Sequence, residues 1–175
     1  ADVHGDGWTV VIVGAPRPGI LSNPQIGYAH VFYNSASGLV TSPSWSITND
    51  LEGTWFGATV TGVGDVNNDT YDDVLVGAPY TKVSIDGVDQ PAGCVYLYMG
   101  SSTGLKASPA WTHCGATIGG KFAASLSAAG DINQDGYDDF LVGEPFFSLS
   151  NEKQGAVYLF FGSVGGVRTD YFERT

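Results

Sequence analysis

Runs of apolar residues that end in glycine recur along this chain. The runs lie within residues 10–16, 74–79 and 140–145. Each is followed by a segment in which apolar and polar residues alternate, at 27–33, 93–98 and 155–160. Alternation with a period of two predicts half-buried β-strands, and a short apolar run bounded by glycine is consistent with a buried strand. The alternating segments start 66 and 62 residues apart, so the chain is an internal repeat of strands.

A further strand is predicted at the start of each complete unit. Residues 55–60 and 121–126 align, with Phe56 and Phe122 in register. The second segment is rich in alanine, as a short helix would be, but its partner is β-branched, so we interpret both as strands. Each complete unit then has four short strands and no crossover helix. Radially repeated four-stranded sheets are the blades of β-propellers, which predicts an all-β fold.

The repeats divide one domain, residues 1–175, into a partial unit and two complete ones. The boundaries are at about residues 1–52, 53–118 and 119–175. The first unit lacks its first strand, so three, four and four strands are expected. Propellers need about four to eight blades, and three cannot close a ring. The chain is a segment of a larger propeller, assembles with other chains, or is an open array; we favour the segment, because the chain begins inside a blade.

Composition and charge narrow the classes of function. The 175 residues include 25 glycines, and 43% are hydrophobic and 14% charged, which is typical of one turn-rich β domain. The net charge is −11, and the seven Lys and Arg residues form no cluster. This argues against nucleic acid or an anionic membrane surface as a partner. No apolar stretch approaches the roughly 18 residues of a membrane span, so no membrane insertion is expected.

Two similar nine-residue loops, at 65–73 and 131–139, concentrate the acidic residues. Oxygen-bearing side chains occupy loop positions 1, 3, 5 and 9, and a backbone carbonyl at position 7 completes the set. The predicted ligands are Asp65, Asn67, Asp69, Tyr71 and Asp73, and Asp131, Asn133, Asp135, Tyr137 and Asp139. Calcium takes about six to eight oxygen ligands in flexible geometry and tolerates such a set better than magnesium does. We therefore expect two Ca²⁺ sites.

The charges in each loop strengthen this prediction. Each loop holds four carboxylates, and two charges about 4 Å apart repel by roughly 1 kcal/mol in water and about 4 kcal/mol at an effective dielectric of 20. The loops begin as EF-hands do, but Val76 and Val142 stand where that motif has its bidentate glutamate, so strand-to-strand loops are expected. Polar residues also form turns that bind no ion. The recurrence of the same alternating oxygens favours metal.

The loops differ at individual positions. Position 6 favours glycine because the chain turns sharply there; Gly136 meets that need and Thr70 does not, so we expect tighter binding at 131–139. The first unit places Asp2, His4 and Asp6 at positions 1, 3 and 5 but Val10 at position 9. We expect this third loop to be degenerate and not to bind metal.

The motifs that flank the loops resemble those of a known family. The Phe-Gly pair at 56–57 and the Gly-Ala-Pro triplet at 77–79 are similar to the FG-GAP repeats of integrin α-subunit propellers and of their bacterial and fungal relatives. The third unit departs from the motif at Ala123 and Glu144. The resemblance covers essentially the whole chain. It implies that the ten loop residues bind calcium in an extracellular or cell-surface adhesion module, which recognises a protein or glycan ligand on cells or in the extracellular matrix.

The two cysteines bear on the cellular compartment. Cys94 and Cys114 are equally distant from Gly104, the centre of a predicted hairpin. Directly opposed strand residues are close to disulfide range, so we predict a bridge, with two buried thiols as the alternative. A disulfide together with calcium indicates a location outside the cytosol.

The sequence is compatible with three classes of function. Adhesion would use the long segments 17–25, 80–91 and 146–154, because loops on rigid scaffolds carry recognition, although they could equally be passive insertions. A lectin would use exposed Trp45, Trp55 and Trp111, residues whose recurrence also fits packing between blades.

Catalysis is the third function. The Gly-x-Ser-x-Gly pattern at 100–104, with His113 nearby, matches a nucleophile elbow, but that motif needs a strand-turn-helix setting. The segment joins two predicted strands, so we expect no enzyme activity. A non-catalytic propeller domain of a larger secreted enzyme remains an alternative.

Overall fold

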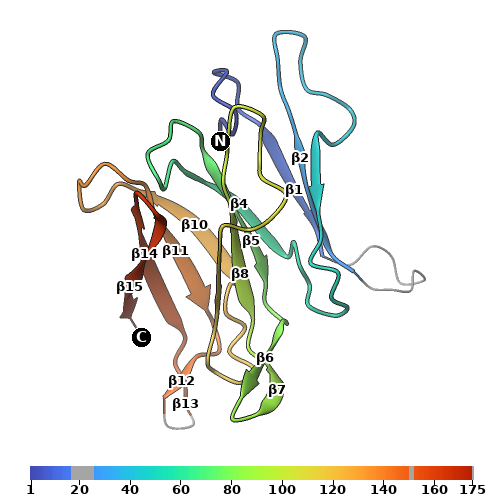
Figure 1. Cartoon of the computed structure of the whole chain (residues 1–175). Helices are drawn as coiled ribbons and strands as arrows, with labels where there is room; N and C mark the ends of the chain where they lie inside the picture. Colours follow the sequence, from blue (N-terminus) through green and yellow to red (C-terminus); the bar gives the residue numbers. More distant parts are fainter. Residues whose placement is uncertain (17–25, 150–151, 175) are drawn as a thin grey trace.

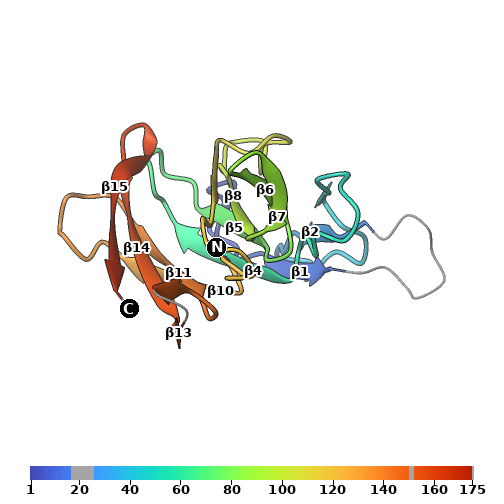
Figure 2. The same ribbon diagram turned by 90° about the horizontal axis from the view of Figure 1, so that it is seen from below.

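The computed structural model describes residues 1–16, 26–149 and 152–174, and every regular element in them is a strand. Three antiparallel sheets stand side by side (Figure 1) and splay apart when seen from below (Figure 2). No helix in the described residues is long and apolar enough to cross a membrane. The all-β fold class is confirmed.

The sheets have three, four and four strands, as the repeats predict. The first sheet runs in the order β1 (Val11–Ala15), β2 (Tyr28–Phe32), β3 (Trp45–Ile47). The second runs β4 (Thr59–Gly64), β5 (Asp73–Ala78), β8 (Cys94–Tyr98), β9 (Trp111–Cys114). The third runs β10 (Ser125–Gly130), β11 (Asp139–Glu144), β14 (Ala156–Ser163), β15 (Gly166–Arg174). This order is that of propeller blades.

Two short hairpins project from the segments that follow β5 and β11. They are β6 (Lys82–Ile85) with β7 (Val88–Pro91), and β12 (Ser148–Leu149) with β13 (Glu152–Lys153). The sequence of both segments predicts only long connections, because their strands are too short for a clear alternation of apolar and polar residues. The third long segment, 17–25, lies outside the described residues.

The hydrophobic core lies between neighbouring sheets. Every residue of β5 is buried, because the second sheet is covered on both faces. Val74 and Val76 pack into the cluster shared with the first sheet, and Leu75 packs into the cluster shared with the third. A strand buried on both faces is apolar throughout. This explains why β5 appears in the sequence as a continuous apolar run.

The strands predicted to begin at residues 55 and 121 begin four residues later, at Thr59 and Ser125. Residues 55–58 and 121–124 form tight turns instead, closed by bonds from the Ala58 amide to the Trp55 carbonyl and from the Ala124 amide to the Lys121 carbonyl. The prediction of strand here was wrong because each turn carries a fully buried phenylalanine out of its own sheet and between two sheets. Positive φ angles at residues 55, 57, 121 and 123 make this possible.

Cys94 and Cys114 form a disulfide, as predicted. They lie directly opposite each other in the β8–β9 pair, so Gly104 is at the centre of that hairpin. The bridge ties the outer strand of the second sheet to the strand beside it.

Candidate metal centre

The two acidic loops connect the first two strands of the second and third sheets. In each, the aspartate at position 1 accepts two backbone N–H bonds from further along the loop. Asp65 accepts from Asp69 (2.9 Å) and Thr70 (2.6 Å), and Asp131 accepts from Asp135 (3.0 Å) and Gly136 (2.8 Å). These bonds curl each loop around its first carboxylate.

The side chains at positions 3 and 5 close on the same point. The Asn67 amide donates to Asp69 Oδ2 at 3.0 Å, and Asn133 donates to Asp135 Oδ2 at 3.0 Å. In both loops the asparagine Oδ1 also accepts the position 5 amide, at 3.2 and 3.0 Å. Oxygens from three alternate positions therefore converge in both copies. Hard cations such as calcium prefer this type of ligand.

Position 9 supplies a carboxylate buried beneath each loop. Asp73 and Asp139 are fully buried. Asp73 accepts the amides of Val66 (3.1 Å) and Gly100 (2.9 Å). Asp139 accepts the equivalent pair in the third sheet, from Ile132 and Gly162, both at 3.0 Å. Each buried aspartate thus joins its loop to the hairpin that leaves the third strand of the same sheet.

Burial raises the pKa of the Asp73 carboxyl to about 7. Hydrogen bonds from Gly100 and Val66 oppose this rise in pKa, and the charges of Asp69 and Asp65 add to it. A carboxyl surrounded by other acids is costly to ionise without a compensating cation. A divalent ion in the loop would provide that compensation, and the oxygen side chains at positions 1, 3 and 5 are donors of the type that calcium takes.

The sharp turn expected at position 6 is present in both loops. Thr70 has a φ of 78° and Gly136 a φ of 90°. Glycine adopts this conformation freely, whereas a β-branched residue is strained there. The structural premise of the predicted difference between the loops is confirmed, and the order of their affinities stays a prediction.

The first loop is folded like the other two. Asp2 Oδ1 accepts the amides of Gly5 (2.9 Å) and Asp6 (3.2 Å), and Oδ2 accepts that of Gly7 (2.7 Å). His4 Nε2 lies 3.1 Å from Asp6 Oδ2, and the ligand atoms of Asp2, His4 and Asp6 lie within 4.8 Å of one another. The hydrogen bonds to Asp2 match those to Asp65 and Asp131, but this loop has Val10 at position 9 in place of a buried carboxylate. That it does not bind metal stays a prediction.

The acids at position 8 have a role that the sequence did not predict. Asp138 Oδ2 accepts the Asp65 amide at 2.9 Å, and the Asp138 amide donates to the Asp65 carbonyl at 3.1 Å. Asp72 makes the same pair of bonds with Asp2, at 2.7 and 3.1 Å. These acids link successive loops instead of filling the ligand set. Their recurrence in both copies is the signal that could have revealed the role.

The other candidate sites have structural explanations. The segment 100–104 connects β8 and β9, where Ser101 Oγ donates to the Gly104 carbonyl at 2.6 Å, so the strand-turn-helix setting of a nucleophile elbow is not found there. His113 lies in β9 against Trp111 and Phe122, and burial lowers its pKa. These contacts are those of a packed aromatic cluster.

The recurring tryptophans also pack between sheets. Trp111 meets Phe140 and Phe160 edge-on, at centroid distances of 5.9 and 5.2 Å. Trp45 meets Tyr98 at 5.1 Å, and its Nε1 donates to the Lys106 carbonyl at 3.2 Å. The packing interpretation fits these two residues better than a sugar platform does.

Comparison with known proteins agrees with the repeat geometry. The FG-GAP repeat model matches residues 56–98 and 122–160, and each match begins at the buried phenylalanine of a turn. This chain contains FG-GAP repeats. Over 167 residues, 95% of its length, it is 33% identical to integrin alpha-8 of Gallus gallus. It is 31% identical to integrin alpha-5 of Xenopus laevis over 89% of its length and 35% identical to integrin alpha-6 of Gallus gallus over 85%.

The FG-GAP chain spans only a small part of these relatives. It covers 15% of the alpha-8 relative, 14% of the alpha-5 relative and 13% of the alpha-6 relative. The resemblance to the FG-GAP repeats of integrin α-subunits is confirmed.

Proposed function

We propose that this FG-GAP chain is a calcium-binding, non-catalytic adhesion module of the integrin α type, which acts outside the cell. The observation that carries the proposal is the pair of loops with matching hydrogen bonds, each with three converging oxygen side chains above a fully buried aspartate. The similarity to integrin α-subunits supports the adhesion role, and the disulfide supports the extracellular location.

The ion would act on the stability of the loops. One Ca²⁺ would be held by Asp65, Asn67, Asp69, the Tyr71 carbonyl and Asp73, and a second by Asp131, Asn133, Asp135, the Tyr137 carbonyl and Asp139. Calcium supplies the positive charge that offsets carboxylate repulsion. Because each aspartate at position 9 also accepts an amide at or just beyond the end of the third strand, ordering the loop would stabilise the whole end of the sheet.

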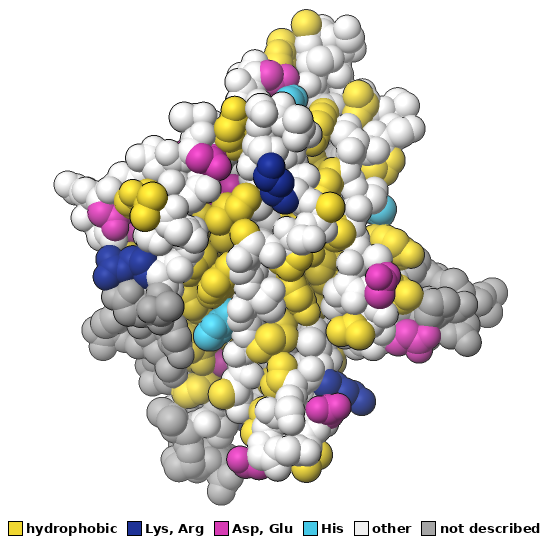
Figure 3. Space-filling model, viewed as in Figure 1, with side chains coloured by type: hydrophobic (Ala, Val, Ile, Leu, Met, Phe, Trp, Pro, Cys, Tyr) yellow, Lys and Arg dark blue, Asp and Glu magenta, His cyan; other side chains and the backbone are white. Residues whose placement is uncertain are grey.

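Ligand recognition would take place at the opposite end of the sheets. The loop 65–73 comes directly before β5, whereas the β6–β7 hairpin follows it, so the two lie at opposite ends of that strand (Figure 1). The hairpin tip exposes Val88, which is 55% accessible. On the face shown in Figure 3, Lys and Arg side chains are few and separated, consistent with a protein or glycan ligand and not with nucleic acid.

Thermal unfolding with and without calcium tests the metal sites. A ligand that binds only the folded state stabilises it by RT ln(1 + [L]/Kd), about 2.7 kcal/mol at a hundredfold excess over Kd. We expect Ca²⁺ to raise Tm, EDTA to reverse the shift, and the double variant Asp69→Ala/Asp135→Ala to abolish it. A Tm that does not respond to Ca²⁺ or EDTA in the parent chain would contradict calcium binding.

Binding assays with immobilised chain test the adhesion role. The chain is exposed in Ca²⁺ to purified extracellular-matrix proteins and, separately, to a glycan array. We expect matrix-protein binding that Val88→Asp weakens while the calcium-dependent Tm shift is retained. Binding to glycans alone would support the lectin alternative, and no binding in either assay would contradict recognition by this chain.

A further inference from the structure

A hollow opens between segments of the second and third sheets, at the end opposite the acidic loops. It has a volume of about 540 Å³. Its lining comes from three segments: Ile85 of the β6–β7 hairpin, residues 116–118 of the connection between the two sheets, and Phe146, Ser148 and Lys153, which follow β11. Two of these segments follow β5 and β11, which begin at the acidic loops, so the hollow lies at the other end of both strands.

Backbone hydrogen bonds hold the three segments together. The Gly119 amide donates to the carbonyl of Pro91, the last residue of β7, at 2.7 Å. The Phe146 amide donates to the Gly120 carbonyl at 3.1 Å. The connection between the sheets is therefore bonded to the hairpin and to the third sheet. The hollow is formed before a ligand arrives, which lowers the entropy cost of binding.

The β6–β7 hairpin turns an apolar face toward the hollow. Ile85 and Val88 are directly opposite each other in the strand pair, so their side chains point to the same side. Side chains alternate along a strand, which places Ser84 and Asp89 on the other side. Ile118 adds further apolar surface and is 58% exposed. The hollow therefore offers contacts to an apolar group.

Two lysines that are distant in the sequence converge beside the hollow. Lys121 Nζ lies 4.7 Å from the centre of the Phe146 ring, and Lys153 Nζ lies 4.9 Å from the same centre. Lys121 Nζ also lies 4.9 Å from the centre of the Tyr80 ring. These cation–π contacts position the two ammonium groups without neutralising them. Within the part of the chain that the structure describes, no ion pair joins either lysine to a carboxylate.

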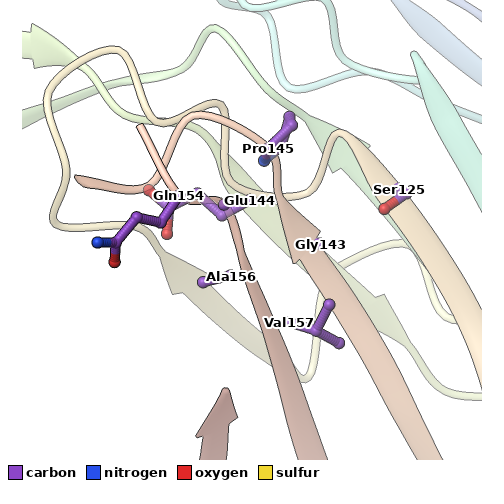
Figure 4. Close-up of a pocket in the computed structure, with 8 residues that line it drawn as sticks. Ser125, Gly143, Glu144, Pro145, Gln154, Ala156 and Val157 are labelled. Atoms are coloured by element: carbon purple, nitrogen blue, oxygen red, sulfur yellow. The ribbon is translucent and has the colours of Figure 1, made fainter. Parts of the chain in front are cut away.

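The acids at this end of the sheets leave that positive charge in place. Glu144, the last residue of β11 (Figure 4), is fully buried, and its Oε2 accepts the Tyr158 hydroxyl at 2.6 Å. Asp86 is in the exposed turn of the β6–β7 hairpin. Among the described residues that line the hollow, Lys153 is charged and none is an acid. An anion would therefore meet positive charge here, although the chain as a whole has a net charge of −11.

We propose that this hollow binds an acidic peptide segment, in which an apolar side chain has a carboxylate on either side. The apolar side chain packs against Ile85, Ile118 and Phe146. The carboxylates accept charge-assisted hydrogen bonds from Lys121 and Lys153. The inference rests on the proposed recognition at this end of the sheets, and it adds the chemical class of the ligand.

The lining favours a peptide over an acidic sugar. Besides Lys153, the side chains of Thr117 and Ser148 are the hydrogen-bonding groups among the described residues of the lining. A sugar buried here would leave several hydroxyl groups without a partner, which is costly. An apolar side chain has no such cost, and its burial is favourable.

NMR titration of the whole chain in Ca²⁺ tests the proposal, with acetyl-Glu-Leu-Glu-amide as the probe. We expect the probe to shift the amide resonances of Ile85, Ile118 and Phe146. Its affinity should fall severalfold when the salt concentration is raised, because salt screens the charge pairs. Acetyl-Gln-Leu-Gln-amide lacks the charges and acetyl-Glu-Gly-Glu-amide lacks the apolar side chain, so both should bind severalfold more weakly than the probe.

Lysine variants isolate the interaction. The double variant Lys121→Gln/Lys153→Gln should bind the probe as weakly as the parent chain binds the uncharged peptide. Lys153→Gln alone should lose part of the affinity, and because Lys153 is exposed this variant keeps its fold. Lys82→Gln is the matched control, since Lys82 is exposed on the face of the hairpin that carries Ser84 and should leave the affinity unchanged.

Three results would overturn the proposal. They are equal affinity of the parent chain and Lys153→Gln for the probe, resonance shifts confined to another part of the chain, and binding of a glucuronic-acid-containing tetrasaccharide but not of the probe. If the probe does not bind while matrix proteins do, the inference fails and the adhesion role stands. Binding of the probe without binding of any matrix protein would support the hollow as a peptide site and contradict the adhesion role.

Discussion

The Asp138 carboxylate accepts a hydrogen bond of 2.9 Å from the backbone amide of Asp65, and so ties the third acidic loop to the second. A Cβ at Gly64 would overlap this carboxylate, so the chain before Asp65 leaves room for it. The same link recurs between Asp72 and Asp2. The acid at loop position 8, which lies outside the predicted ligand set, is therefore part of the contact between sheets.

Replacing Asp138 should weaken that contact without removing a predicted calcium ligand. A hydrogen bond to a charged group contributes about 1.5–3 kcal/mol, so we expect Asp138→Ala to lower the free energy of unfolding by that order. Asp138→Asn keeps an acceptor oxygen and should cost less. Urea unfolding in EDTA measures both, with Asp89→Ala on an exposed strand as the control. Equal stability of the Asp138→Ala variant and the parent chain would contradict the role.

Calcium affinity should differ between the loops because of position 6. Titration calorimetry on Asp135→Ala measures the calcium affinity of the remaining loop at 65–73, and calorimetry on Asp69→Ala measures that of the loop at 131–139. We expect the loop at 131–139 to bind calcium more tightly. Thr70 carries a φ of 78°, a strained conformation for a β-branched residue. Replacing it with glycine in Thr70→Gly should make calcium binding to the loop at 65–73 more favourable by about 1 kcal/mol and so narrow the difference in affinity between the two loops. The reciprocal change Gly136→Thr should weaken the tighter site. The opposite order of affinities would reject this explanation.

The stability of the metal-free chain should depend on the charge of Asp73. Burial raises its pKa to about 7 from the usual value of 3.8, so between these pH values the folded state binds more protons than the unfolded state. Stability is therefore greatest at low pH and falls as the pH rises toward 7, by at most about 4 kcal/mol from this group. Urea unfolding in EDTA at several pH values should show this slope.

Asp73→Asn is expected to remove most of that slope, because the amide does not ionise. Saturating Ca²⁺ should also reduce it in the parent chain, since the ion stabilises the carboxylate. Asp89→Asn, on the exposed strand β7, is the control and should leave the slope in place. The slope of unfolding free energy against pH in the Asp73→Asn variant is subtracted from that of the parent chain. A remaining slope of the opposite sign, with stability rising toward pH 7, would contradict the raised pKa of Asp73.

Close approach of the Phe-Gly turn should make Gly14 sensitive to a single methyl group. A Cβ there would overlap the Gly57 carbonyl, so the first two sheets would have to separate. Overpacking of this kind costs about 1–3 kcal/mol, and Gly14→Ala should lower the unfolding free energy by that amount. Gly165→Ala is the matched control, because a Cβ at Gly165 meets no atom within 4 Å. Thermal unfolding that places the two variants at the same Tm would refute the contact.

The predicted site could be identified from the sequence because its ligands are close neighbours along the chain. Asp65, Asn67 and Asp69 are brought together by one turn, and the turn is specified by residues inside the loop. The role of Asp138 could not be inferred in this way. Its partner lies 73 residues away, and only the packing of one sheet on the next brings them together.

The turns at 55–58 and 121–124 show the same limit within the fold. The β-branched residues of the first segment and its alignment with the second predict strands there, but the burial of Phe56 and Phe122 between sheets requires positive φ angles and moves the strand starts to Thr59 and Ser125. Tertiary packing outweighed local preference, since burying an aromatic ring completely contributes more free energy to folding than the strand propensity of a few residues does.

Period, spacing and symmetry along the chain predicted the strand order of the three large sheets, the disulfide partners and the composition of the acidic loops, but not the two short hairpins β6–β7 and β12–β13. The tertiary structure decided which acid faces the loop interior and which faces a neighbouring sheet. It also decided that Val95 is buried while Val157 is exposed at the same repeat position. The contacts of these acids and the burial of these valines depend on which residues of the adjacent sheet pack against them, and the local sequence pattern does not specify those residues.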